Sequence, residues 1–191
     1  MDLQQIKQKI DAELALAVKN RKSDFHVLNL ADKQPSVRSL VLRGFEQNSI
    51  IWFHTHYSST KVQFLSEHPE VCIHGYCRLN KVQLRIYGCA EILHSDQDSM
   101  IKWDNLPASA RRCYLAETPG AVLESAGSGY AEEFDQNKLL KQPETEFARG
   151  NFSRIKVDIF RIDYLSLAAS GHRRAIFDKT ENGWDGAWAV P

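Results

Sequence analysis

A predicted strand that runs directly into a helix start is the most informative feature of the sequence. The strand ends at residues 54–56 (His-Thr-His), and residues 58–61 (Ser-Ser-Thr-Lys) follow it. The N–H groups and the positive dipole end of a helix start attract an anion, which hydroxyl and ammonium groups can also bind. The segment is therefore a candidate phosphate site. The alternative is an ordinary N-cap followed by a solvated lysine.

Two further predicted strands present polar side chains that could face a ligand. Arg38 and Arg43 bracket an apolar strand at an odd spacing, which places them on opposite faces, so one of them could reach an anion. On residues 81–88, Gln83 lies on the polar face and could offer a donor and an acceptor to a planar heterocycle. The alternatives are solvated arginines and the wet side of an antiparallel strand.

A turn of small residues near the end of the chain precedes a histidine and two arginines. The small residues, 168–171, would let a ligand approach the backbone closely. His172 could donate or accept a proton, and Arg173 or Arg174 could bind an acidic group. A basic surface turn is the alternative.

Histidines on neighbouring predicted strands raise the question of a metal ion. His54 and His56 alternate on one strand, and His74 lies in another. Because no carboxylate or cysteine completes a ligand set, we expect no metal site and histidines that hydrogen-bond to backbone or water. The sequence contains no G-x-S-x-G, Walker or G-x-G-x-x-G motif.

The elements that must position these residues are mostly strands. Apolar residues at helical spacing predict an N-terminal helix over residues 3–18, within an N-terminal segment 1–20. Alternation over 24–94, interrupted by one helix at 58–67, predicts an antiparallel sheet. The pattern as a whole indicates a small β-barrel that carries helices on its outside.

The second half of the chain is less regular. A helical region is expected at 95–116, with a cap at Ser95-Asp96 and a break at Pro107. Residues 118–150 are expected to form a surface excursion with a short helical stretch around 130–140. Strands return at 153–167 and near 174–177, followed by a short tryptophan-rich end.

Composition limits the class of protein. The chain has 191 residues, 24 basic and 24 acidic side chains and 43% hydrophobic residues, which favours one soluble domain over residues 1–191. A net charge of zero argues against duplex nucleic acid or an anionic membrane as partner. The four cysteines form no C-x-x-C pair and are expected to be reduced, packed thiols. With neither a membrane-spanning run nor a signal-peptide core, we expect a cytoplasmic protein.

Four of these segments, in this order, resemble the pyridoxamine 5'-phosphate oxidase family over about residues 20–191. They are Arg38–Arg43, Trp52–Lys61, Gln83 and Gly171–Arg174. The family has an R-x-V-L-L-K strand, a strand ending in F-[YF]-T-N, an S-R-K at a helix start and a glutamine on a later strand. The resemblance implies a mainly β (α+β) fold, a six-stranded antiparallel split β-barrel with flanking helices. It also implies a homodimer that binds FMN at the subunit interface.

The resemblance implies a role for each matched residue. Lys61 would hold the FMN phosphate, and Gln83 would contact the isoalloxazine ring. Arg173 would orient an anionic substrate. His172, by the chemistry of its side chain, is the best candidate for proton transfer, so these two are the candidate catalytic residues. The residues implied in FMN binding are Arg38, Ser39, Leu40, Val41, Leu42, Arg43, His54, Thr55, Ser59, Thr60, Lys61 and Gln83.

The chain departs from the family pattern mainly on the substrate side. Thr60 stands where the family has an arginine, and Ala175 and Phe177 replace the histidine and last arginine of R-L-H-D-R. Leu165 replaces a tryptophan, and the family's Tyr, Arg and Ser before residue 118 are missing. These departures argue against oxidation of pyridoxamine phosphate itself.

The function implied is that of an FMN-dependent oxidoreductase acting on another small organic substrate. The alternative is a non-catalytic flavin- or haem-binding carrier or sensor on the same fold. A third possibility is an empty barrel that acts as a dimeric binding module.

Overall fold

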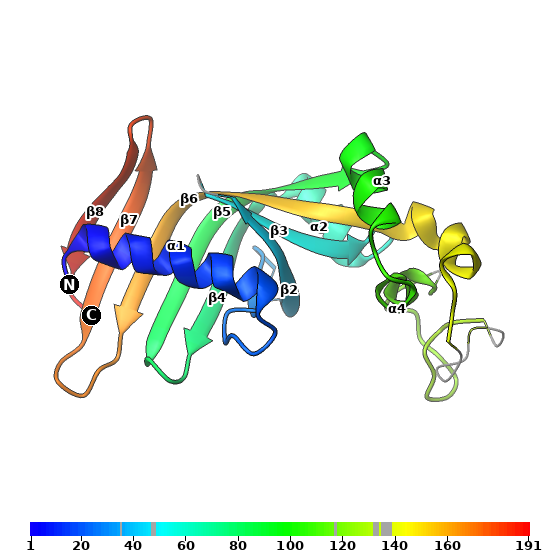
Figure 1. Cartoon of the computed structure of the whole chain (residues 1–191), viewed down its shortest axis with the longest axis horizontal. Helices are drawn as coiled ribbons and strands as arrows, with labels where there is room; N and C mark the ends of the chain where they lie inside the picture. The colour runs from blue at the N-terminus through cyan, green and yellow to red at the C-terminus, as the bar shows by residue number, and fades with distance from the viewer. Residues whose placement is uncertain (35, 47–48, 117, 132–133, 135–138) are drawn as a thin grey trace. The chain divides into compact units, whose positions relative to one another are not determined.

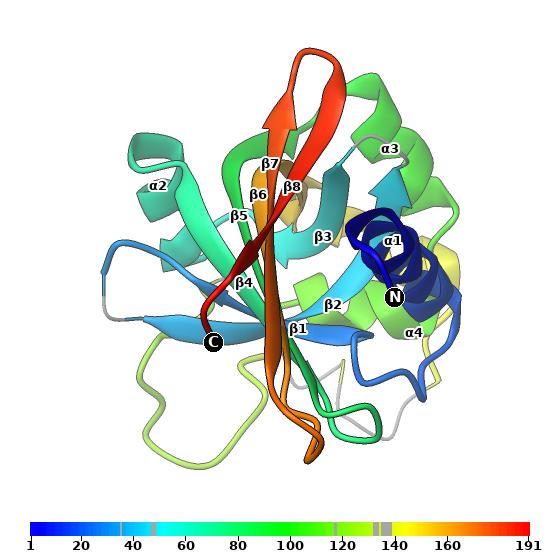
Figure 2. The same ribbon diagram turned by 90° about the vertical axis from the view of Figure 1, so that its left-hand side faces the viewer.

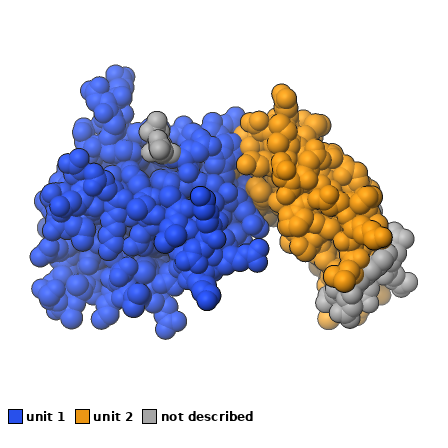
Figure 3. Space-filling model, in the orientation of Figure 1, with its two compact units in different colours: residues 1–53, 68–91, 156–191 blue, residues 54–67, 92–155 orange. Residues whose placement is uncertain are grey.

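The computed structural model divides the chain into two compact units (Figure 3). Unit 1 comprises residues 1–53, 68–91 and 156–191, and unit 2 comprises residues 54–67 and 92–155. The assignment of residues 1–191 to one domain stays a prediction. The structure describes residues 1–34, 36–46, 49–116, 118–131, 134 and 139–191.

The described residues form one sheet of eight strands, in the order β3-β2-β1-β4-β5-β6-β7-β8 (Figures 1 and 2). Because β3 also pairs with β6, the first six strands of this order close into an antiparallel barrel, and β7 and β8 continue the sheet beyond β6. The predicted fold class is confirmed. The strands are β1 Val27–Ala31, β2 Val37–Glu46, β3 Ile50–His56, β4 Glu70–Cys77, β5 Val82–His94, β6 Phe152–Ser166, β7 Arg173–Thr180 and β8 Gly183–Ala189.

The N-terminal helix α1, Leu3–Lys19, begins with a capping box. The Gln5 N–H donates to the Asp2 carboxylate (2.8 Å), and the Asp2 N–H donates to the Gln5 side chain (3.0 Å). Ile6, Ile10 and Leu14 are buried, and the helix packs against β2 and β8. The apolar stripe predicted for residues 3–18 thus covers one side of unit 1 (Figure 1).

The helices of the middle region follow the predicted caps and breaks. Asp96 caps α3 by accepting the Ser99 N–H at 3.1 Å, and Pro107 separates α3 from α4. No described helix has the length and apolarity to cross a bilayer. The helices are α2 Thr60–Glu67, α3 Gln97–Asp104, α4 Ala108–Arg111 and the 3₁₀ helices η1 Arg112–Tyr114 and η3 Gln142–Asn151.

Two elements were not expected from the sequence. Residues 142–151 form η3, although their polar composition predicts an irregular surface segment. Residues 183–189 form β8, which pairs with β7 although its glycines and aspartate are poor strand formers. A Cβ on Gly186 would lie 2.9 Å from the Phe177 ring, so the missing side chain makes room for a core residue. The helical stretch expected around 130–140 lies largely outside the described residues.

The prediction of packed thiols is wrong for two cysteines. All four are free, as predicted, but Cys89 and Cys113 are exposed, whereas Cys77 is buried. Cys89 lies on the outward side of the alternation of β5, between the buried Gly88 and Ala90. Strand membership therefore did not imply burial, because a strand buries only alternate residues.

Replacement of Gly88 by alanine is expected to destabilise the barrel by about 2–3 kcal/mol, because overpacking against backbone is hard to relieve. Its Cβ would lie 2.6 Å from both the Asp158 carbonyl oxygen and Val157 Cγ1. Gly150→Ala is the matched control, since no heavy atom lies within 4 Å of a Cβ there. Urea unfolding checks the pair, and equal stabilities would contradict the prediction.

Candidate functional site

Two buried hydroxyls and one ammonium group meet at the start of α2, within unit 2. Lys61 Nζ donates to Thr55 Oγ1 (3.1 Å) and to Ser59 Oγ (3.0 Å). The two hydroxyl oxygens are 3.4 Å apart, and both residues are 5% exposed. We call Thr55, Ser59 and Lys61 the cradle. Hydroxyls, an ammonium group and a helix N-terminus are together the donor set that suits a phosphate monoester.

Backbone contacts fix the geometry of the cradle. Ser59 Oγ donates to the His56 carbonyl (2.7 Å), and the Val62 N–H donates to the Ser59 carbonyl (2.9 Å), which closes the turn between β3 and α2. Ser153 Oγ donates to the carbonyl of Thr55 (3.1 Å). The end of β3 is therefore held where the helix begins, and the hydroxyls of the cradle are oriented before any ligand arrives.

His56 fastens the cradle turn to the segment that follows η1. The Ser58 N–H donates to its Nδ1 (3.2 Å), so the proton of the neutral ring lies on Nε2, which donates to the Ala116 carbonyl (2.7 Å). Ala116 also lines a cavity of about 750 Å³ in unit 2, with Leu123 and Tyr130 among its other walls. One buried imidazole thus connects the cradle turn to the wall of this cavity.

The ionisation of His56 is expected to make stability depend on pH. Burial lowers the pKa of His56 below the ordinary value of 6.5, and the charge of Lys61 lowers it further. The hydrogen bond to Ala116 raises the pKa but does not offset the burial. Below about pH 6.5 the folded state therefore binds fewer protons than the unfolded state. The contribution of His56 to the free energy of unfolding is complete above that pH and decreases as the pH falls.

The variant His56→Gln isolates this effect, because its amide keeps one donor and one acceptor but does not titrate. We expect the unfolding free energy of the wild type to fall more than that of the variant between about pH 7.5 and about pH 5.5. Parallel pH profiles of the two proteins would contradict the assignment.

The predicted residues of β2, in unit 1, point to both sides of the sheet. Ser39 Oγ donates to Asn29 Oδ1 (2.8 Å) on the outer face. Arg38 lies on the opposite face, and its Nη1 donates to Asp32 Oδ2 (2.9 Å). Arg43 is exposed beside an irregularity in the β2–β3 register between Leu42 and Gly44. The candidates of this strand therefore do not share one surface.

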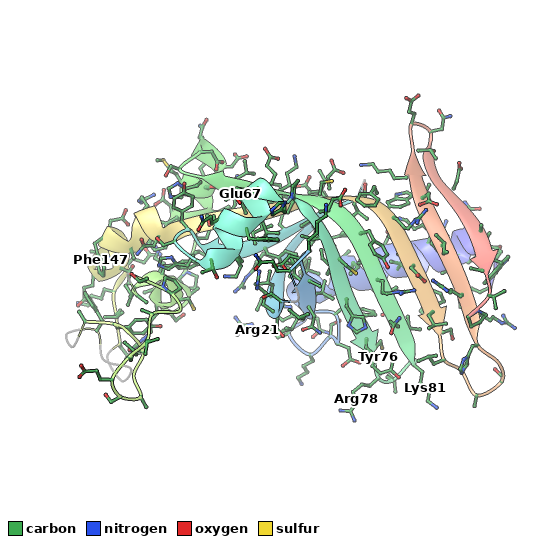
Figure 4. All side chains as sticks on the ribbon, turned by 180° about the vertical axis from the view of Figure 1, so that it is seen from behind. Arg21, Glu67, Tyr76, Arg78, Lys81 and Phe147 are labelled. Carbon is green, nitrogen blue, oxygen red and sulfur yellow. The ribbon has the colours of Figure 1, made fainter. Side chains whose placement is uncertain are left out.

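The alternation predicted for β5 is confirmed, because Val82, Leu84 and Ile86 are buried while the residues between them are half-buried. Gln83 pairs with Tyr76 on the outer face of the sheet. Tyr76 lies at the hairpin end of β4 and β5, near the labelled Lys81 (Figure 4). Gln83 and Ser39 thus face the same side of unit 1, each on a different strand.

The implied catalytic residues lie at the start of β7. His172 and Arg173 are both exposed. Arg173 lines a cavity of about 230 Å³ in unit 1, together with Tyr164 and Trp188. The neighbouring Arg174 has a different environment, since its Nε (3.1 Å) and Nη2 (2.8 Å) donate hydrogen bonds to the buried carboxylate of Asp163.

Asp163 is the polar site residue that sequence reasoning missed. It is 4% exposed and also accepts a hydrogen bond from Arg85. The sequence offers a faint signal, because Asp163 interrupts the mostly apolar run at the end of a predicted strand. Its two partners lie on other strands, so their identity cannot be deduced from spacing along the chain.

His54 and His56, two of the three candidate histidines, contact an aromatic ring and the backbone. The ring of His54 lies edge-on to Phe152, with centroids 4.9 Å apart, and His56 makes the bonds described above. In the part of the chain that the structure describes, no group of three or more His, Cys, Asp or Glu side chains is arranged to hold a metal ion.

Comparison with known proteins places these features in a family context. Residues 4–94 match the family model described as pyridoxamine 5'-phosphate oxidase, FMN-binding domain. A pyridoxine/pyridoxamine 5'-phosphate oxidase of Dichelobacter nodosus is 27% identical over 161 residues, which cover 81% of this chain and 72% of that protein. The chloroplastic enzyme 1 of Arabidopsis thaliana is 38% identical over 79 residues, 40% of this chain and 15% of that protein.

Solved structures show the fold. A pyridoxamine 5'-phosphate oxidase-related, FMN-binding protein of Nostoc punctiforme matches with a TM-score of 0.73 at 20% identity, covering 96% of each chain. PhzG of Burkholderia lata, solved with tetrahydrophenazine-1-carboxylic acid, matches with a TM-score of 0.68 at 16% identity, covering 96% of this chain and 91% of that one. The predicted resemblance and the prediction of FMN as cofactor are confirmed by the family match.

Proposed function

We propose that this chain, whose residues 4–94 match the FMN-binding domain of the pyridoxamine 5'-phosphate oxidases, is an FMN-dependent oxidoreductase for a small organic substrate. The observation that carries the proposal is the cradle, in which Lys61 Nζ lies 3.1 Å and 3.0 Å from two buried hydroxyl oxygens. The Lys61 ammonium group, the Thr55 hydroxyl and the N-terminus of α2 fit the phosphate of FMN, while the Ser59 hydroxyl, whose proton goes to the His56 carbonyl, accepts from Lys61. The identities of 27% and 38% leave the substrate open.

The residues of the chain would bind and orient FMN and the substrate. Bound FMN would accept a hydride from the substrate. Lys61 would balance the phosphate charge, while Thr55 and Ser59 would fix its position. Gln83 would donate to and accept from the edge of the flavin ring. Arg173 would orient an anionic substrate, and His172 would exchange a proton with it; both are exposed at the start of β7. Arg38–Arg43, His54 and Thr60 complete the proposed flavin residues.

The proposal includes a homodimer with the flavin at the subunit interface. We also propose one functional domain over residues 1–191, located in the cytoplasm, where its four free cysteines would stay reduced.

A specific observation favours a second function, that of a flavin carrier or sensor without turnover. Ala175 and Phe177, which stand where the resembled signature has a histidine and an arginine, are 0% and 2% exposed. They pack in the core of unit 1, and neither side chain carries a hydrogen-bond donor. Oxidation of pyridoxamine phosphate itself is accordingly not proposed.

The test combines an absorption spectrum with reduction. We expect the purified protein, after incubation with FMN and removal of free flavin, to retain a flavin spectrum and to elute as a dimer. Anaerobic addition of NADH or NADPH, followed by air, separates the two functions. An enzyme would bleach and recover at catalytic rates, whereas a carrier would keep its colour. A protein that stays colourless after FMN would contradict both.

A further inference from the structure

A row of polar side chains crosses the outer face of the sheet in unit 1. The strand registers place Ser39 opposite Asn29, Asn29 opposite His74, and His74 opposite Arg85. Residues directly opposite each other in a sheet share a face, so these four side chains lie on the same side. Arg85 reaches Asp163 on β6, which continues the row. The row contains Ser39 and passes beside Gln83, two of the proposed flavin residues.

The charges at the end of this row do not cancel. Asp163 has a side chain that is 5% exposed and forms ion pairs with both Arg85 and Arg174. Burial alone would raise its pKa, but the hydrogen bonds and charges of Arg174 and Arg85 lower it below the ordinary value, so the carboxylate stays ionised. Two guanidinium groups and one carboxylate leave one positive charge in excess.

One N–H group of the Arg85 guanidinium has no acceptor among the described residues. Its Nη2 bonds to Asp163, but its Nε is buried without a hydrogen-bond partner among the described residues. Its side chain as a whole is 35% exposed, so a ligand can reach the guanidinium. A buried donor without an acceptor destabilises the folded protein.

We propose that Arg85, held in place by the carboxylate of Asp163, binds the carboxylate of a small monoanionic ligand on this sheet face. A planar guanidinium matches a planar carboxylate, and one excess positive charge matches one negative charge better than the double charge of a phosphate monoester. The site itself stands on the contacts within unit 1.

The position of Arg85 suggests what the ligand does. Gln83 precedes Arg85 by two residues on the same strand face, a separation of about 7 Å. As an inference that rests on the proposed flavin function, the carboxylate belongs to the substrate, which Arg85 would hold beside the ring contacted by Gln83. Arg173, the residue that the resemblance implies for this task, lies at the exposed start of β7 instead.

Benzoate, a planar monoanion, is the probe. Isothermal titration calorimetry on FMN-free and FMN-loaded protein is expected to show saturable binding that weakens at least about tenfold in Arg85→Met, as loss of a charge-assisted contact requires. The substitution leaves Asp163 paired with Arg174, so the fold should persist. Arg85→Lys, which keeps the charge but lacks the guanidinium, should give an intermediate dissociation constant.

Arg161→Met is the matched control. Arg161 lies on the same sheet face, and its guanidinium is held by Asp178 through contacts of 2.6 Å and 3.1 Å. The variant Arg161→Met removes the same charge as Arg85→Met but should change benzoate affinity by less than about twofold. Absence of benzoate binding, equal loss in both variants, or loss in Arg173→Met but not in Arg85→Met would overturn the inference.

The same titrations separate this inference from the proposed function. If the wild type fails to bind FMN but binds benzoate in an Arg85-dependent manner, the anion site stands and the flavin function falls. If FMN binds normally and benzoate affinity does not depend on Arg85, the flavin function stands and the anion site falls.

Discussion

The variant Lys61→Met is expected to bind FMN about 10- to 100-fold more weakly than the wild type, while its affinity for riboflavin stays the same. The loss follows from removing one charge-assisted contact with the phosphate, worth about 1.5–3 kcal/mol. Riboflavin lacks the phosphate, so it cannot sense the missing ammonium group. Quenching of flavin fluorescence on titration with protein measures both dissociation constants.

The fold of this variant should be intact. Thr55 Oγ1 and Ser59 Oγ lie 3.4 Å apart and can bond each other when the lysine is gone. The control Lys102→Met removes the same charge from the exposed face of α3 and should leave both affinities unchanged. An equal loss for riboflavin and FMN would show that Lys61 supports the fold of the site and not the phosphate.

The variant Asp163→Ala is expected to lower the free energy of unfolding by about 2–3 kcal/mol. It leaves two guanidinium groups facing each other without their shared carboxylate. Removing one partner of a fully buried pair costs about 3–5 kcal/mol, and the partial exposure of both arginines reduces that cost. Urea denaturation at neutral pH measures the change.

The control for this prediction is Asp178→Ala. Asp178 is gripped by Arg161 in the same two-point geometry, but both side chains are about half exposed, at 48% and 50%. Its loss should cost less than about 1 kcal/mol. Adding Arg85→Met to Asp163→Ala should restore part of the lost stability, because it removes one of the two unpaired cations. Similar costs for the two aspartates would contradict the burial argument.

The sequence alone predicted most of the elements and a candidate phosphate site at residues 58–61. Each signal is local. The apolar stripe of residues 3–18, the alternation over 24–94 and the capping aspartate at 96 depend on neighbours within one or two turns. The phosphate site was predicted for the same reason, since residues 58–61 directly follow a predicted strand at the start of a helix.

The structure corrected the inferences that required knowing which face of a strand is buried or which strands are adjacent. Cys89 proved exposed because its place in the alternation turns outward. Residues 183–189 became a strand because β7 offered a partner and Gly186 left room for Phe177. Neither fact follows from propensity, because pairing overrides the preferences of single residues.

The cluster around Asp163 was decided by the tertiary structure. Arg85 and Asp163 are 78 residues apart, and they meet only because β5 lies next to β6 in the sheet. A local sequence pattern shows which residues of one strand share a face, but not which strand will be its neighbour or at what register. The sequence therefore determined the candidate phosphate site, whereas strand pairing produced the candidate anion site.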